Sequence, residues 1–243
     1  MKKIFYIIFF YTVLPLTADW SPYFLDRSIS LSDIQKSDYI ELQNKIIKIL
    51  ENSWCSKEKT MLLMDLVVLE KPQVCVEIGA FTGSSILPVA AALKYNKSGE
   101  IYAIDAWSNR EATFGMTNDE AKAWWSQLNM TAVRDAYYHN IKHYKVESFC
   151  KTLHAPSNVA VNSLPSIDFL HIDGNYSCET SYEDVQLYLP KVKIGGYILF
   201  TNLHWIVEGK ITRMKAFSRL LDFCEILAFI DDRSTYLLRK LKE

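Results

Sequence analysis

The sequence predicts an α/β protein with a doubly wound, mostly parallel sheet and helices on both faces. Short apolar runs alternate with helical segments between residues 74 and 201, which is the pattern of β–α units. A glycine turn at residues 79–83 joins the first of these runs directly to a helix. Near the C-terminus, two strand-like runs flank the polar turn 231–233 and predict an antiparallel hairpin.

Length and charge limit the classes of function. The chain has 243 residues, enough for one large domain or two small ones, and 49% of them are hydrophobic. The formal net charge is −1 and the lysines and arginines are scattered, which argues against a nucleic-acid partner. Five cysteines occur without a C-x-x-C pair, which argues against a zinc or thioredoxin-like site.

The N-terminus has the pattern of an export signal. A basic head of three residues is followed by the apolar run 4–16 and by the small residue Ala18. We therefore predict a signal peptide over residues 1–18 and an exported protein. The apolar run is too short for a stable membrane span. The alternatives are an uncleaved tether or a buried first helix, and the alternative location is the cytoplasm.

The rest of the chain divides into an N-terminal helical cap, residues 19–70, and a main domain, residues 71–243. Within the main domain, residues 107–145 are rich in Trp and Tyr and are expected to form a lid and part of the substrate wall. The expected helices are 33–50, 56–69, 84–95, 118–127, 130–144, 177–189 and 210–221. The expected strands are 74–78, 100–104, 151–154, 167–172, 197–201, 224–230 and 235–239.

The glycine turn is the first candidate ligand site. A strand, a tight turn and a helix place backbone N–H groups at a helix N-terminus, where a polar ligand can dock. The spacing runs from Glu77 to Gly79 and Gly83, which is neither the G-x-G-x-x-G of dinucleotide binders nor a phosphate-binding P-loop. The alternative is a turn that only joins strand to helix.

Asp105 gives this turn a second polar group. It ends the next strand about 20 residues after the turn, where a carboxylate can accept hydrogen bonds from both hydroxyls of a ribose. The alternative for Asp105 is a helix cap or a turn former. Ser157, Asp173 and the pair 201–202 follow the later strands, so all these residues are predicted to lie along one rim of the sheet.

Taken together, these stretches resemble class I S-adenosylmethionine-dependent methyltransferases. The resemblance rests on EIGAFTGS at 77–84 and AIDAW at 103–107. The stretch IDFLHIDG at 167–174, followed by LP at 189–190 and the glycine pair 195–196, is similar to the small-molecule O-methyltransferase branch, which includes macrolide-sugar and catechol methyltransferases. The resemblance implies a Rossmann-like sheet of seven strands with an antiparallel last strand.

The resemblance also implies the roles of individual residues. The expected cofactor-binding residues are Glu77, Gly79, Ala80, Phe81, Gly83, Ser84, Ser85, Asp105, Ala106, Trp107, Ser157 and Asp173. The glycine turn would contact the methionine part of S-adenosylmethionine, with Glu77 orienting the turn and Ser84 or Ser85 capping the helix. Asp105 would bind the ribose, and residues 106–107 and Ser157 would flank the adenine.

The sequence departs from the metal-dependent relatives after the fourth and fifth strands. Residues 173–178 read DGNYSC where those relatives commonly have DGDHSY, and residues 201–202 read TN where they have two Asp or Asp-Asn. Because a hard divalent cation prefers several anionic oxygens, we predict no metal site. The candidate catalytic residues are Asp173 and His204, while His171, inside a strand, is expected to be a core histidine.

The predicted function is in-line methyl transfer to a hydroxyl of a small-molecule acceptor. The lost acidic positions keep a second hypothesis open, a non-catalytic or repurposed cofactor-binding protein on the same fold. A nicotinamide-dependent oxidoreductase is disfavoured by the glycine spacing. The sequence leaves the assembly open between a monomer and a homodimer.

Overall fold

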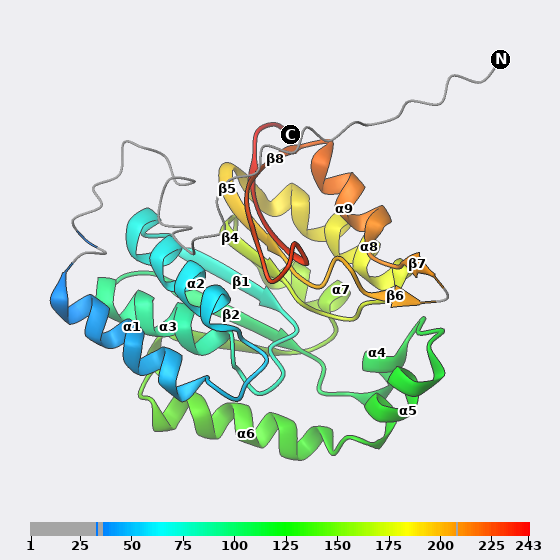
Figure 1. Ribbon diagram of the computed structural model, residues 1–243, viewed down its shortest axis with the longest axis horizontal. Helices are drawn as coiled ribbons and strands as arrows, with labels where there is room; N and C mark the ends of the chain where they lie inside the picture. The colour runs from blue at the N-terminus through cyan, green and yellow to red at the C-terminus, as the bar shows by residue number, and fades with distance from the viewer. Residues whose placement is uncertain (1–32, 34–35, 208) are drawn as a thin grey trace.

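The computed structural model describes residues 33, 36–207 and 209–243, and Figure 1 shows how their elements are arranged. The predicted signal peptide at 1–18 lies outside the described residues. In the described part of the chain, no helix is both long enough and apolar enough to cross a membrane.

Seven strands of the described chain form one sheet, in the order β3-β2-β1-β4-β5-β9-β8. The strands are β1 (Val74–Ile78), β2 (Glu100–Asp105), β3 (Cys150–His154), β4 (Ile167–Ile172), β5 (Val192–Phe200), β8 (Cys224–Ile230) and β9 (Thr235–Lys240). The pairs from β3 to β5 are parallel, whereas β9 pairs antiparallel with both β5 and β8. The predicted seven-stranded, mostly parallel sheet with a C-terminal antiparallel hairpin is therefore confirmed.

Helices cover both faces of this sheet, as predicted (Figure 1). They are α1 (Ser37–Ile49), α2 (Lys57–Glu70), α3 (Ile86–Asn96), α4 (Asn109–Thr113), α5 (Asp119–Gln127), α6 (Met130–His143), α7 (Ser157–Ala160), α8 (Cys178–Tyr188) and α9 (Met214–Leu221). Alternate residues of β1 enter different cores: Cys75 packs with α1, α2, α3 and α6, while Val76 packs with α7, α8 and α9. α2 thus belongs to the same core layer as α3.

Local sequence signals explain where several of these helices begin. Ser56 caps α2 by accepting the backbone N–H of Lys59 at 3.0 Å. Asn118 caps α5 by accepting the N–H of Ala121 at 2.7 Å. α3 begins at Ile86 and tolerates Pro88 because N–H groups in the first turn have no intrahelical partner.

Three predicted boundaries are wrong. The first helix, expected from residue 33, begins at Ser37. The helix expected over 210–221 begins only at Met214, because the preceding residues form a small hairpin of β6 (Ile206–Val207) and β7 (Lys210–Ile211). The glycine pair 195–196 lies inside β5 and does not precede it. The register between β4 and β5 shifts there, because the chain bulges where Gly195 takes a φ of 81°.

Candidate functional site

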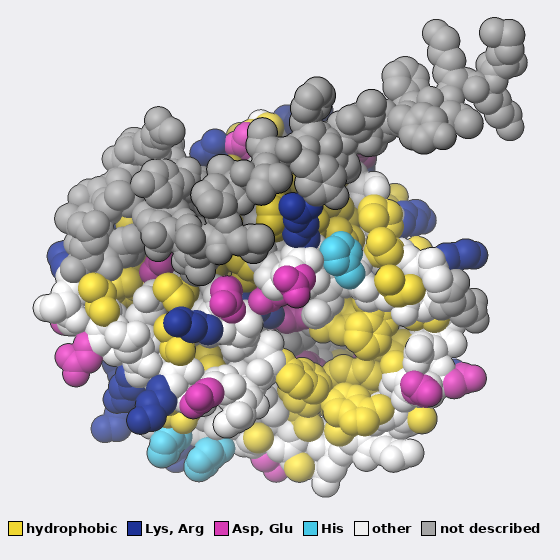
Figure 2. All heavy atoms as spheres, viewed as in Figure 1, with side chains coloured by type: hydrophobic (Ala, Val, Ile, Leu, Met, Phe, Trp, Pro, Cys, Tyr) yellow, Lys and Arg dark blue, Asp and Glu magenta, His cyan; other side chains and the backbone are white. Residues whose placement is uncertain are grey.

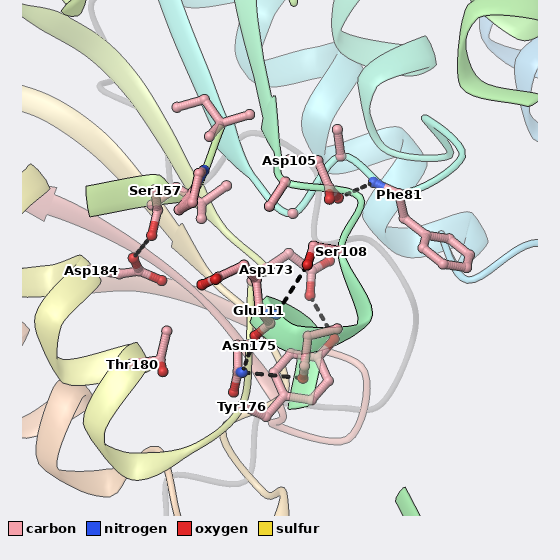
Figure 3. Close-up of a pocket in the computed structure, with 18 of the residues that line it drawn as sticks. Phe81, Asp105, Ser108, Glu111, Ser157, Asp173, Asn175, Tyr176, Thr180 and Asp184 are labelled. Atoms are coloured by element: carbon pink, nitrogen blue, oxygen red, sulfur yellow. Dashed lines mark hydrogen bonds between the residues drawn. The ribbon is translucent and has the colours of Figure 1, made fainter. Parts of the chain in front are cut away.

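A cavity of about 520 Å³ lies at the carboxyl ends of the parallel strands (Figure 3). The sheet order reverses here, because β2 and β3 extend to one side of β1 while β4 and β5 extend to the other. Ligands of doubly wound sheets bind at such a point. Loops after β1, β2, β3 and β4 line the cavity, together with the start of α2 and residues of α4 and α5.

The glycine turn is pressed against the end of β4. Gly79 has a φ of 92°, and a Cβ built on it would lie 2.4 Å from the backbone oxygen of Asp173. The backbone N–H groups of Gly79 and Ala80 both donate to the carbonyl of Ile104, at 2.9 and 3.2 Å. Only glycine fits this path, so the turn brings the backbone close to whatever occupies the cavity.

Asp105 ties the glycine turn to β2. Its Oδ2 accepts the N–H of Phe81 at 2.8 Å, and its Oδ1 accepts the N–H of Trp107 at 2.7 Å. Burial raises the pKa of Asp105, while these two backbone bonds act in the opposite direction. Each oxygen has a second lone pair, and the carboxylate lines the cavity, so it can accept two more hydrogen bonds from a ligand (Figure 3).

Asp173 accepts four hydrogen bonds from other side chains. Lys59 Nζ donates to its Oδ2 at 2.8 Å, and Thr201, Tyr176 and Asn202 donate to its Oδ1 at 2.6, 3.0 and 3.2 Å. Burial opposes the charged carboxylate, but its donors and the Lys59 charge outweigh burial and hold the pKa of Asp173 well below its usual range. A carboxylate in this state is a poor proton acceptor.

A second polar row lies beneath Asp173, inside the sheet. Glu77 and His171 are register partners on β1 and β4, and both side chains are fully buried. His171 Nδ1 lies 3.0 Å from Glu77 Oε2, and its Nε2 lies 3.7 Å from Asp173 Oδ2. Ser85 donates its hydroxyl to Glu77 Oε1 at 2.5 Å. Ser85 stands at the N-cap position of α3, but its side chain binds Glu77 and does not cap the helix.

A carboxyl group of a different kind lies on the far side of the cavity. Asp184 on α8 is 1% exposed and accepts the hydroxyl of Ser157 at 2.5 Å (Figure 3). Burial raises the pKa of Asp184 to about 7, against a smaller opposing effect of the Ser157 bond and of Arg213. Asp184 therefore titrates near neutral pH, whereas Asp173 stays ionised.

Aromatic side chains form the outer wall. Phe81 stacks on Trp54 with ring centroids 4.7 Å apart and meets the edge of Trp125 at 5.8 Å. Trp54, Phe114 and Trp124 are exposed. Figure 2 shows hydrophobic side chains gathered on the face over which α4 and α5 lie. The wall offers planar apolar contact to a ligand.

The structure brings most of the predicted site residues to this one cavity. The predicted residues that line it are Gly79, Ala80, Phe81, Ser84, Ser85, Asp105, Ala106, Ser157 and Asp173. Their individual roles toward a ligand stay predictions.

Four predicted site residues lie elsewhere. Glu77 is buried beneath the cavity, and Gly83 lines a separate hollow on the other side of the glycine turn. Trp107 is buried behind the turn, where its indole N–H donates to the Phe81 carbonyl at 2.9 Å, so it supports the turn from outside the cavity. His204 is exposed in the turn after β5 and does not line the cavity.

Sequence reasoning missed Lys59 and Asp184. Lys59 shares a helix face with Leu62, Leu63 and Leu66, and a lone lysine on an apolar stripe was the available signal. Asp184 had no such signal, because a single acidic residue on an amphipathic helix is ordinary.

The cavity residues do not fit a divalent cation. Asp173 supplies the only carboxylate at the ends of β4 and β5 in the described chain, and the Lys59 ammonium already occupies its Oδ2. No cluster of three His, Cys, Asp or Glu side chains able to hold a metal occurs among the described residues. The arrangement at Gly79 and Asp105, in contrast, fits an adenosyl cofactor, since it offers a backbone cradle and free carboxylate lone pairs.

Comparison with known proteins agrees with this geometry. A family model described as a methyltransferase domain matches residues 76–203, more than half of the chain. The chain therefore belongs to this methyltransferase domain family. No curated protein matches the chain.

Solved structures share the fold at low identity. The O-methyltransferase NovP superposes with a TM-score of 0.61 at 13% identity, covering 77% of this chain and 81% of NovP. TomG from Streptomyces achromogenes, in complex with SAM, gives 0.57 at 12% identity over 87% and 96%. An O-methyltransferase from Bacillus cereus, in complex with SAH, gives 0.57 at 12% over 87% and 97%. These likenesses establish the Rossmann-like methyltransferase fold.

Proposed function

We propose that this protein transfers a methyl group from S-adenosylmethionine (SAM) to a hydroxyl of a small molecule. One observation carries the proposal: the glycine turn, bonded to Asp105, forms one side of a cavity whose other side holds Asp173. NovP, TomG and the Bacillus cereus protein are O-methyltransferases of the same fold, which supports the choice of a hydroxyl acceptor.

The residues of the cavity divide into two halves. On the β1–β2 side, Gly79 lets the backbone approach the cofactor, and the free lone pairs of Asp105 accept the ribose hydroxyls. When bound there, SAM supplies a methyl group on a positively charged sulfur, which an oxygen can displace in line. On the β4 side, Asp173 and Tyr176 border the acceptor, and Phe81 and Trp125 enclose its apolar part.

Calorimetry with SAM and with its product S-adenosylhomocysteine (SAH) tests the cofactor half. We expect SAH to bind the wild type and the Asp105→Ala variant to lose at least tenfold in affinity. Glu120→Ala is the matched control, since Glu120 is an exposed carboxylate on α5 outside the cavity. No binding at millimolar cofactor would contradict the proposal. Transfer of labelled methyl to a panel of small hydroxyl compounds then tests the reaction.

A second function, a cofactor-binding protein without transferase activity, is favoured by one observation. Asp173 is fully engaged by four donors, and no histidine of the described chain lines the cavity. SAH binding of normal strength with no methyl transfer across the panel would favour this second function over the first.

We also propose that residues 1–18 are an export signal, on the sequence pattern alone. Cells make SAM in the cytosol, so an exported enzyme would work where it meets another cell's cofactor. Mass spectrometry of the mature N-terminus tests this, and an intact Met1 on cytosolic protein would contradict it. A cap over residues 19–70 and a homodimer are further proposals, which limited proteolysis and light scattering test.

A further inference from the structure

Lys59 places a buried positive charge on the wall of the cavity. The residue lies in the first turn of α2 and is 4% exposed, with its aliphatic part on the same helix face as Leu63 and Leu66. The helix holds it there, because the Ser56 cap fixes the backbone N–H of Lys59 itself. A lysine so placed is costly unless its ammonium has partners.

The ammonium has hydrogen-bonding capacity left over. Of its three N–H groups, one donates to Asp173 Oδ2 at 2.8 Å, and no other described residue accepts from it. Burial works against the charged form, but Asp173 and Glu77 outweigh it and raise the pKa of Lys59. Cys55 is neutral here, because burial raises the pKa of its thiol to about 11. Lys59 therefore enters any reaction as a cation and cannot act as a base.

Positive charge gathers at the Asp173 end of the cavity. Lys59 donates to Asp173, and Arg213 is fully buried with its guanidinium 4.2 Å from the ring centroid of Phe200. SAM would add the positive charge of its sulfonium. An acceptor oxygen that binds as an anion beside Lys59 would be stabilised by these positive charges.

We propose that Lys59 binds the acceptor oxygen as an oxyanion, so that the protein methylates hydroxyls acidic enough to ionise on binding. This rests on the proposed function. The acceptor releases its proton to solvent as it binds. An oxygen electron pair then forms the new C–O bond to the methyl carbon, and the C–S bond breaks with its electron pair staying on sulfur, which leaves an ether and neutral SAH.

Among the described residues, this assignment explains why no free base lies beside Lys59: the carboxyl group that titrates near neutral pH, Asp184, lies on the far side of the cavity. His171 is buried between Glu77 and Asp173, His204 is exposed outside the cavity, and Asp173 is held ionised by its donors. If the acceptor arrives as an anion, none of these groups needs to take a proton. Lys59 then supplies the electrostatic stabilisation of the bound oxygen.

A chromophoric phenol tests the proposal on the wild type. The probe is 4-nitrophenol, whose phenolate absorbs in the visible, titrated with pH in the presence of protein saturated with SAH. We expect the bound probe to have a pKa at least one unit lower than the free probe, which is tenfold tighter binding of the phenolate than of the phenol. A bound pKa equal to or above the free value, or no binding of the probe, overturns the proposal.

Variants then assign the effect to Lys59. We expect Lys59→Met to abolish the pKa shift of the probe and Lys59→Arg to keep part of it. Lys57→Met is the matched control, because Lys57 is exposed on the same helix turn. If circular dichroism shows that Lys59→Met is unfolded, the test compares the pKa shift of the probe in folded Lys59→Arg with the shift in the wild type. A shift in Lys59→Arg equal to that of the wild type would then count against the proposal. A full shift in folded Lys59→Met overturns the proposal.

A final comparison shows whether Lys59 binds the acceptor or the carboxylate of the cofactor. SAH carries a carboxylate, whereas 5′-methylthioadenosine lacks it. If Lys59→Met loses more than tenfold in SAH affinity but keeps its affinity for 5′-methylthioadenosine, Lys59 binds the cofactor carboxylate and the proposal is overturned. If wild-type protein binds no SAH, the proposed function fails, whatever the probe does. SAH affinity unchanged in Lys59→Met, with the probe shift lost, supports the proposal.

Discussion

Asp184 offers the sharpest test of the cavity's electrostatics, because its ionisation is linked to folding. Its pKa is about 7 in the folded protein, against 3.8 for an unperturbed aspartate, and its side chain is 1% exposed. Between these two values the folded state binds more protons than the unfolded state. The free energy of unfolding therefore falls as pH rises from about 4 to about 7 and levels off above that.

The size of the effect follows from the pKa difference. About three pKa units at 1.36 kcal/mol each give a loss of about 4 kcal/mol by pH 8. Asp184→Asn removes the ionisation, and its amide oxygen can still accept the Ser157 hydroxyl. We expect the variant to match the wild type near pH 4 and to be more stable by up to about 4 kcal/mol at pH 8.

Urea unfolding of both proteins at four pH values between 4.5 and 8 measures the difference. Glu179→Gln is the matched control, since it makes the same change of charge at an exposed position of the same helix and should leave the pH dependence unchanged. A stability difference between Asp184→Asn and wild type that does not grow with pH would refute the reasoning. So would a variant less stable than wild type at pH 8.

Three further predictions concern the glycine turn, the Asp105 side chain that is bonded to it, and the cap of α2. Gly79→Ala should lose more than tenfold in SAH affinity by calorimetry, because the new Cβ meets the Asp173 carbonyl; Gly195→Ala, with a similar φ but open space, should bind normally. Asp105→Asn should lower stability by about 1–3 kcal/mol in urea unfolding, because its amide must face one of two backbone N–H donors. Ser56→Ala removes both the α2 cap and the hydroxyl bond to Asp231, so it should cost at least about 1 kcal/mol by the same measurement, and an unchanged stability would contradict this.

The sequence was most informative where local rules and the fold agree. The first strand was predicted with its observed bounds, 74–78, because an apolar run ends there at a glycine that the backbone path requires. Prediction from the sequence failed where the local structure depends on contacts between residues that are far apart in the chain. The residues after β5 form a hairpin before α9, where Thr212 donates to the Tyr176 carbonyl at 2.7 Å, and no local pattern records that bond.

The same limit applies to the site. The rim could be predicted because the carboxyl ends of parallel strands meet at one edge, so Asp105 and Asp173 follow from strand order. The partner of Asp173 could not be predicted, since Lys59 lies 114 residues earlier, and its place on the apolar face of its helix indicates burial without naming a partner. Only packing of α2 on the sheet brings the two side chains together.

The buried charges connect the two halves of the cavity. Ser85 at the start of α3 binds Glu77, which meets His171, which in turn lies beside Asp173 and hence Lys59. Removing Lys59 or Asp173 alone would leave an uncompensated buried charge, which costs about 3–5 kcal/mol. A hydrophobic row would fold at least as well, so stability alone does not account for it. The row instead fixes Asp173 and Lys59 relative to the glycine turn, which is the alignment that in-line methyl transfer requires.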